Sequence, residues 1–207
     1  MTKMKWNLQK CRQKKWFMGG VYVMAVTVLA IPFLIGCSRN GSNTTPEAGN
    51  QNYKGYSNTV DTMELADAVK NELGENYYPN TQMESQMLED VYGVESGSYE
   101  EFYGEIPAIS TNVDTLVIVK ANEGCEDEIE QALVSYMENS KADTMQYPMN
   151  IGKIQSSQVK TFGNYVCFVQ LGGNVMEAMD QGDEAVIKQC QAMNEQALNI
   201  IEERLKS

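Results

Sequence analysis

The chain offers few side chains for acid–base or nucleophilic chemistry, because none of its 207 residues is histidine. This excludes His-based catalytic triads, Cys–His pairs, the common zinc sites and the usual general base near neutral pH. Ser157 and Lys160 match S-x-x-K, a string of serine acyltransferases in which the serine opens a helix. Here the string enters an expected β-hairpin, where positions three apart point to opposite faces. We interpret the match as chance, and no catalytic residue is predicted.

Three cysteines, Cys125, Cys167 and Cys190, follow the N-terminal region and could react as thiols. Cys167 lies in an apolar strand and Cys190 on the apolar stripe of the last helix, so both are expected to be small core residues. A disulfide between them stays possible outside the cell. Cys125 opens a helix and is the most exposed candidate, but the acidic residues around it disfavour the thiolate. We therefore interpret Cys125 as a helix N-terminal residue without a catalytic role.

A carboxylate cluster is the stronger of two candidate metal sites, the other being methionine pairs that could suit Cu(I) but more commonly fill gaps in a core. Asp180, Asp183 and Glu184 surround Gly182 and could bind calcium at the millimolar concentrations found outside cells. The cluster lacks the spaced ligands of a twelve-residue calcium loop, and it would serve equally well as the cap of the last helix. The calcium site is therefore a weak candidate, and the sequence predicts no metal and no cofactor.

The N-terminus carries a more specific chemical pattern at Cys37. Residues 1–36 contain six basic and no acidic residues, and residues 17–35 are almost entirely apolar, as in a secretory signal. Leu34-Ile35-Gly36-Cys37 resembles the lipobox of bacterial lipoproteins, in which the cysteine receives a diacylglyceryl group before the signal is removed. We predict a signal peptide over 1–36, cleavage after Gly36 and lipidation of Cys37. An uncleaved membrane helix over 17–35 is the alternative, and either form places the remaining chain outside the membrane.

The charge balance excludes one class of partner. The full chain has 16 basic and 28 acidic residues, and loss of the signal would leave 10 basic residues and a net charge of −18. Nucleic acids and anionic lipid headgroups attract clusters of lysine and arginine, and none follows Cys37. We therefore expect no nucleic-acid partner, and attachment to the membrane through the lipid alone.

The mature chain is expected to form a tether and a single domain. Residues 37–58 are rich in Asn, Gly, Ser and Thr and predict a flexible spacer, with the domain over 59–207. Capping residues and apolar spacing predict these elements in order: helices from Asp61 to Gly74 and from Thr81 to Gly93, strands 101–109 and 115–121, a helix over 123–140, a hairpin of strands 158–162 and 165–171, and a helix over 183–205. The order ααββαββα predicts an α+β fold, an antiparallel sheet of about four strands with helices packed mainly on one face.

Four short motifs are distributed along the predicted domain: Leu65-Ala66-Asp67-Ala68-Val69, Leu88 with Tyr92-Gly93-Val94, the strand from Asp114 to Ala121, and Gly163-Asn164-Tyr165-Val166. Together they resemble the domain-of-unknown-function family 4358, found in lipoproteins of Gram-positive bacteria. The resemblance spans about residues 60–205 and implies a lipid-anchored extracytoplasmic domain, with no catalytic residues assigned.

Two sets of side chains are candidates for interaction. Tyr77 and Tyr78 form a tyrosine pair, a residue type that buries large area in interfaces at little entropic cost, and Lys120 ends a buried strand. The leading hypothesis is a non-enzymatic lipoprotein of the cell envelope that binds a protein or a small ligand. The alternative is an extracytoplasmic enzyme or enzyme accessory that uses carboxylates, with Lys120 as a polar partner.

Overall fold

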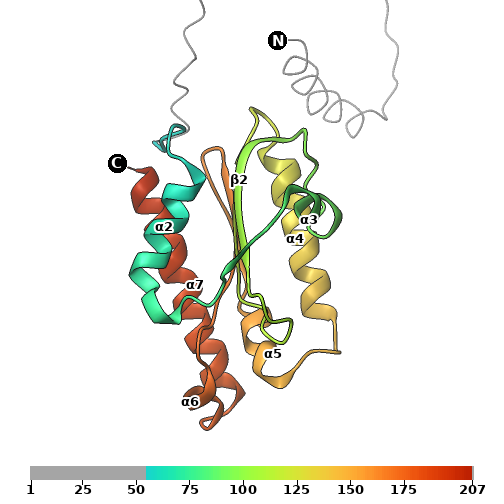
Figure 1. Cartoon of the computed structure of the whole chain (residues 1–207), viewed down its shortest axis with the longest axis vertical. Coiled ribbons are helices and arrows are strands. Elements are labelled where there is room, and N and C mark those ends of the chain that lie inside the picture. The colour runs from blue at the N-terminus through green and yellow to red at the C-terminus, as the bar shows by residue number, and fades with distance from the viewer. Residues whose placement is uncertain (1–54, 207) are drawn as a thin grey trace, which may run out of the picture.

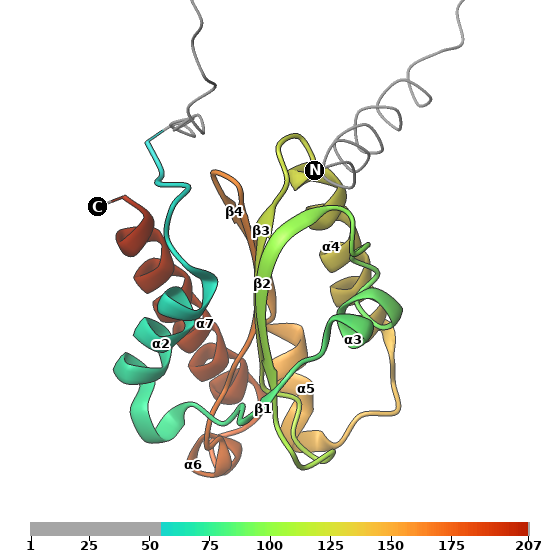
Figure 2. The ribbon, with the colours of Figure 1, turned by 45° about the horizontal axis from the view of Figure 1, so that its top comes forward.

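A computed structural model describes residues 55–206, which form a five-stranded antiparallel sheet between two layers of helices (Figures 1 and 2). The order across the sheet is β1-β2-β3-β5-β4. The strands are β1 (Thr81–Gln82), β2 (Tyr99–Ile106), β3 (Thr115–Ala121), β4 (Gln158–Phe162) and β5 (Tyr165–Gln170). Neighbouring strands all run antiparallel, which confirms the predicted α+β class.

The helices divide between the two faces of this sheet. On one face α2 (Thr62–Leu73) and α7 (Asp183–Leu205) pack side by side, and on the other lie α3 (Ser85–Asp90) and α4 (Glu126–Ala142) (Figure 2). Three short helices complete the domain: η1 (Gly74–Asn76), α5 (Pro148–Gln155) and α6 (Met176–Met179). Figure 1 shows α5 and α6 at its lower end, beyond the ends of the strands.

The two central strands explain why helices cover both faces. Leu116 and Ile118 of β3 belong to the core under α2 and α7, while Val117 and Val119 belong to the core under α4. All six residues of β5 are buried as well. A sheet whose central strands are apolar on both sides must be covered on both sides. The expectation of helices mainly on one face is therefore wrong, although the apolar character of 115–121 already pointed to a central strand.

Two local predictions also differ from the structure. Thr81 does not cap a helix, because Thr81 and Gln82 pair with Ile106 and Glu105 as the edge strand β1, and α3 begins only at Ser85. No helix or strand is predicted between residues 140 and 158, but the structure has α5 there, with Pro148 in its first turn. Proline is common there because its fixed φ suits a helix and its missing N–H has no partner to lose.

The chain enters the domain beside the end of α7. The Ser57 backbone N–H donates to the Leu205 carbonyl oxygen at 2.7 Å, and the Tyr56 hydroxyl donates to Glu202 Oε1 at 2.7 Å. Ordered contacts thus begin slightly before the boundary predicted at residue 59. The predicted signal peptide, Cys37 and most of the tether lie outside the described residues. Between residues 55 and 206, none of the helices combines the length and apolar character that crossing a bilayer requires.

Candidate functional site

The strongest candidate site is a cavity of about 510 Å³ at the lower end of the domain in Figure 1, which we call the end pocket. Four segments far apart in the sequence contribute to it: the chain after η1, the β2–β3 loop, α5 and the chain before α6. Its lining residues are Tyr77, Tyr78, Asn80, Pro107, Ile109, Thr111, Asn112, Met149, Asn150, Lys153, Gly173, Asn174, Val175 and Met176. The volume lies in the range of small-ligand pockets, about 300–1,000 Å³.

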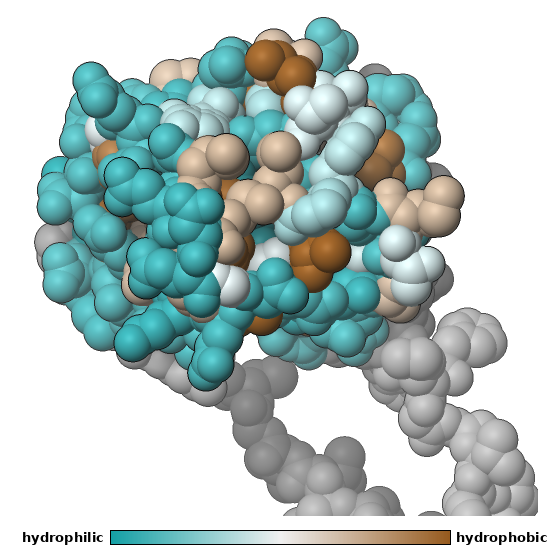
Figure 3. Space-filling view, turned by 90° about the horizontal axis from the view of Figure 1, so that it is seen from below, coloured by the Kyte–Doolittle hydropathy of each residue, from teal (hydrophilic) through white to brown (hydrophobic). Residues whose placement is uncertain are grey.

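Exposed apolar side chains border this pocket. Ile109, Met149 and Met176 line it and are 67%, 41% and 60% exposed, and we call these three residues the apolar rim. The segments 145–151 and 176–179, which contain Met149 and Met176, carry four more exposed apolar side chains: Met145, Tyr147, Ile151 and Met179. Figure 3, which views the domain from below, shows apolar residues gathered on this face among hydrophilic ones. A gathering of exposed apolar residues on a soluble domain typically marks an interaction site.

Beneath the pocket lies a buried ion pair between α5 and the start of β3. Lys153 Nζ is 3.1 Å from both carboxylate oxygens of Asp114 and 3.3 Å from Asn112 Oδ1. The Lys153 side chain is 4% exposed and that of Asp114 is fully buried. Burial raises the pKa of the Asp114 carboxyl, and the Lys153 ammonium opposes part of that shift. The pair therefore joins α5 to the start of β3 and forms part of the base of the end pocket.

The two predicted tyrosines do meet at this pocket. The Tyr78 ring lies over Lys153, with its centroid 5.6 Å from Nζ. The Tyr77 hydroxyl donates to Glu105 Oε2 at 2.8 Å, and Lys70 Nζ lies 3.0 Å from the same oxygen. Tyr77 is therefore held in place by β2 and α2, whereas Tyr78 packs over the ion pair.

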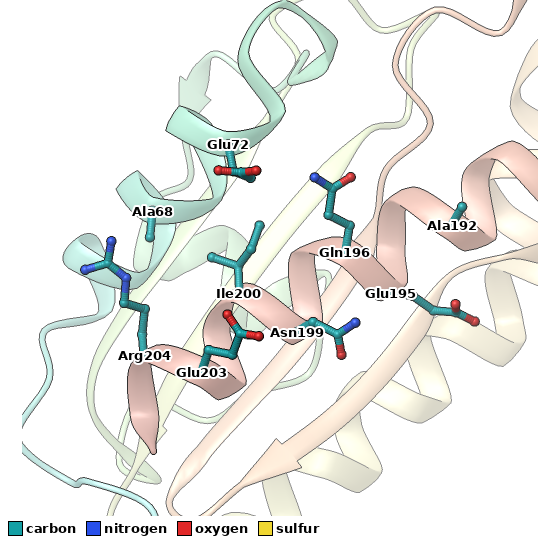
Figure 4. A pocket seen from close by; sticks show the side chains of 9 residues that line it. All are labelled: Ala68, Glu72, Ala192, Glu195, Gln196, Asn199, Ile200, Glu203 and Arg204. Atoms are coloured by element: carbon teal, nitrogen blue, oxygen red, sulfur yellow. The ribbon is translucent and has the colours of Figure 1, made fainter. Parts of the chain in front are cut away.

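A second hollow, of about 550 Å³, runs between α2 and α7 (Figure 4). Its polar side chains, among them Glu72, Glu195 and Gln196, stand apart along two packed helices and do not point to a common centre (Figure 4). A binding site needs a few polar groups that converge in a largely apolar cavity. The end pocket meets that description and the α2–α7 groove does not.

Lys120 lies away from the end pocket. Its Nζ is 3.3 Å from Glu100 Oε2 on β2, and its side chain is only 15% exposed. The charge at the end of a buried strand is thus balanced by a carboxylate, the arrangement expected of an amphipathic side chain whose head reaches water. The structure gives Lys120 no place in a shared site with Tyr77 and Tyr78.

The weaker motifs do not assemble into sites. Asp180, Asp183 and Glu184 are exposed, and between residues 55 and 206 no three His, Cys, Asp or Glu side chains converge in a way that could hold a metal ion. The Ser157 hydroxyl is buried and donates to the Ile154 carbonyl oxygen at 2.6 Å, while Lys160 is exposed on β4. The S-x-x-K string is therefore a coincidence of sequence.

The cysteines are core residues. Cys167 and Cys190 are buried free thiols, so the possible disulfide between them is not formed. Burial raises the pKa of Cys167 to about 12 and that of Cys190 to about 11. Such thiols are almost entirely protonated near neutral pH and are poor nucleophiles. Cys125, expected to be the most exposed of the three, is fully buried, because the residue before α4 packs into the core under that helix.

A comparison with known protein families gives a match for the part of the chain that contains the sheet. Residues 73–171 match the family model "Domain of unknown function (DUF4358)". The match contains all five strands and most residues of the end pocket, and it supports the resemblance found in the sequence motifs. α7 and nearly all of α2 lie outside the DUF4358 match. Neither the curated proteins nor the solved structures gave a match to the chain.

Proposed function

We propose that this protein is an extracytoplasmic lipoprotein whose domain is a non-enzymatic binding module, with the end pocket as its binding site. The observation that carries the proposal is the combination of a concave cavity, an exposed apolar rim and a rigid polar floor at one end of the domain. An apolar surface exposed on an acidic domain carries a cost in solubility that a binding partner would explain. The lipobox at Leu34–Cys37 and the DUF4358 resemblance support the envelope location.

The position of the pocket suits an anchored module. The described chain begins at the end of the domain that holds Tyr56 and the C-terminus, and the end pocket lies at the opposite end (Figure 1). A tether from a lipidated Cys37 would join the domain at the first of these ends. The end pocket would then be free to face away from the membrane, toward the rest of the envelope.

The burial of Asp114 favours binding over catalysis. A carboxyl whose pKa is raised is a common mark of acid–base chemistry. Such a group must come within hydrogen-bond reach of a substrate to act. Asp114 is fully buried beneath Lys153 and does not line the end pocket, so a ligand in the cavity would not touch it.

The binding role can be tested by placing a charge on the rim. In cells that express the full chain, Met176→Asp and Ile109→Asp are expected to abolish the cross-links between this protein and its envelope partner, because each buries a carboxylate in the contact. Met63→Asp is the matched control, since Met63 is 51% exposed on α2, away from the end pocket. Cross-linking in intact cells followed by mass spectrometry is the measurement. If the rim variants keep the cross-links that Met63→Asp keeps, the end pocket is not the binding site.

The predicted lipidation of Cys37 can be tested separately from the binding role. Cys37→Ala is expected to leave an unprocessed precursor about 4 kDa heavier than the mature protein, at roughly 110 Da for each of the 36 signal residues, and to remove lipid labelling. Immunoblotting and metabolic labelling with a fatty acid measure both effects. A wild-type protein that retains Trp16 would show instead that residues 17–35 remain as a membrane helix.

A further inference from the structure

We propose that the end pocket recognises an uncharged, extended peptide segment, with its aliphatic side chains on the apolar rim and its backbone carbonyl oxygens on the side-chain amides of Asn80, Asn112 and Asn174. This inference rests on the proposed binding function and adds the chemical class of the ligand. Three features of the pocket carry it: its lack of net charge, its uncommitted hydrogen-bond donors and the kind of apolar surface around it.

The pocket presents no free charge. Lys153 is the one charged residue among those that line it, and its ammonium group faces both oxygens of Asp114 and the amide oxygen of Asn112. The ammonium donates hydrogen bonds to Asp114 Oδ2 and Asn112 Oδ1, and the Asp114 carboxylate neutralises its charge. A carboxylate or phosphate ligand would find no net positive charge there to offset its own. The pocket therefore suits a neutral group, even though the mature chain is strongly acidic.

Three asparagines that line the pocket, Asn80, Asn112 and Asn174, present hydrogen-bond donors. In each of the three asparagines the amide oxygen accepts a backbone N–H: Ala108 N for Asn80 at 2.8 Å, Asp114 N for Asn112 at 2.9 Å, and Met176 N for Asn174 at 3.1 Å. A backbone N–H can only donate, so these bonds fix which end of each amide is oxygen. Within residues 55–206 no protein acceptor bonds the three Nδ2 groups. Three N–H₂ groups around one cavity match a ligand rich in carbonyl oxygens.

The apolar surface favours a peptide over a sugar. Sugars stack on flat aromatic faces, but Tyr78 covers Lys153, and the Tyr77 hydroxyl is engaged by Glu105. The rest of the apolar lining is aliphatic or thioether: Pro107, Ile109, Met149, Val175 and Met176. Methionine side chains adapt to different apolar partners and are common on surfaces that bind varied peptides. Aliphatic side chains between backbone carbonyls would satisfy both the rim and the asparagines.

The test measures binding of the detergent-solubilised full chain to synthetic ten-residue peptides. The probe peptides place Leu, Ile or Met between Ser and Gly residues, and matched peptides replace the aliphatic residues by Ser, Glu or Lys. Asn80→Asp and Asn174→Asp keep the oxygen that accepts the backbone N–H and replace only the N–H₂ donor. Each is expected to weaken binding of the neutral aliphatic peptides about threefold to tenfold, the effect of one lost hydrogen bond. Asn71→Asp, exposed on α2, adds the same charge elsewhere and should leave the affinity unchanged.

The outcomes separate this inference from the proposed function. The inference holds if neutral aliphatic peptides bind best and both pocket variants weaken them while Asn71→Asp does not. It is overturned if the rim variants abolish the partner cross-links but no neutral peptide binds, or if Asn80→Asp and Asn174→Asp have no effect. Stronger binding of N-acetylglucosamine oligomers, or self-association that the rim variants prevent, would likewise overturn it. If the rim variants leave the cross-links intact, the proposed function itself fails. Unchanged melting temperatures for all variants exclude misfolding as the cause.

Discussion

Replacing Lys153 by methionine is expected to destabilise the domain by about 3–5 kcal/mol, because it leaves the Asp114 carboxylate buried without its counter-charge. Methionine fills nearly the same space as the lysine stem, so the loss reports mainly the missing charge. The carboxyl can escape the penalty by protonation, and its pKa is already raised by burial. A carboxyl whose pKa is higher in the folded than in the unfolded state favours folding at low pH, and this advantage is lost as pH rises. Urea denaturation should therefore show a larger loss at pH 8 than at pH 5.

Two further variants separate the charge effect from packing. Lys153→Met combined with Asp114→Asn removes both charges and should recover a large part of the lost stability, since a neutral pair of similar size often replaces a buried ion pair without great cost. Lys120→Met is the matched control, because the Glu100 partner of Lys120 is 53% exposed, and it should cost no more than about 1 kcal/mol. Equal losses for Lys153→Met and Lys120→Met would mean that the buried pair does not hold α5 to the sheet.

The parts of the fold that were predicted from the sequence are those with a long local pattern. β3 is predicted by its run of apolar residues, which is seven residues long with only one charge. The turn between β4 and β5 is predicted by Gly163-Asn164, a residue pair that favours a tight hairpin. β1 has only two residues, both exposed, and exists because its backbone pairs with the end of β2. No sequence period can show so short a strand, since its stability comes entirely from a partner distant in the chain.

The residues of the candidate site were likewise predicted from the sequence only in part. Tyr77 and Tyr78 were predicted as interaction residues from their type alone, and they do line the end pocket. Lys153 and Asp114 were missed, because they are 39 positions apart and become a pair only when α5 docks against β3. One signal was available: Lys153 lies in a short segment that is otherwise apolar or uncharged, Pro148–Gln155, where a charge requires a partner.

Asn194→Leu is expected to cost about 2–6 kcal/mol, because this buried amide joins three elements that meet near the end pocket. Its Oδ1 accepts the Leu171 backbone N–H at 2.7 Å, and its Nδ2 donates to the Ser156 carbonyl oxygen at 2.8 Å. Leucine has nearly the same shape, but it would leave both backbone groups buried without a partner, at about 1–3 kcal/mol each. Asn194 is fully buried on α7, four positions after Cys190, while the neighbouring Met193 is partly buried and packs against the core.

Asn199→Leu provides the control on the same helix. Asn199 is exposed, so this change should alter the free energy of unfolding by no more than about 0.5 kcal/mol. Leu171 leads into the wall of the end pocket formed by Gly173–Met176, and Ser156 caps the C-terminal end of α5. Any Asn194→Leu protein that still folds should therefore also bind the neutral aliphatic peptides more weakly than Asn199→Leu does. Denaturation curves that coincide for the two variants would show that the amide is not what joins α7 to β5 and α5.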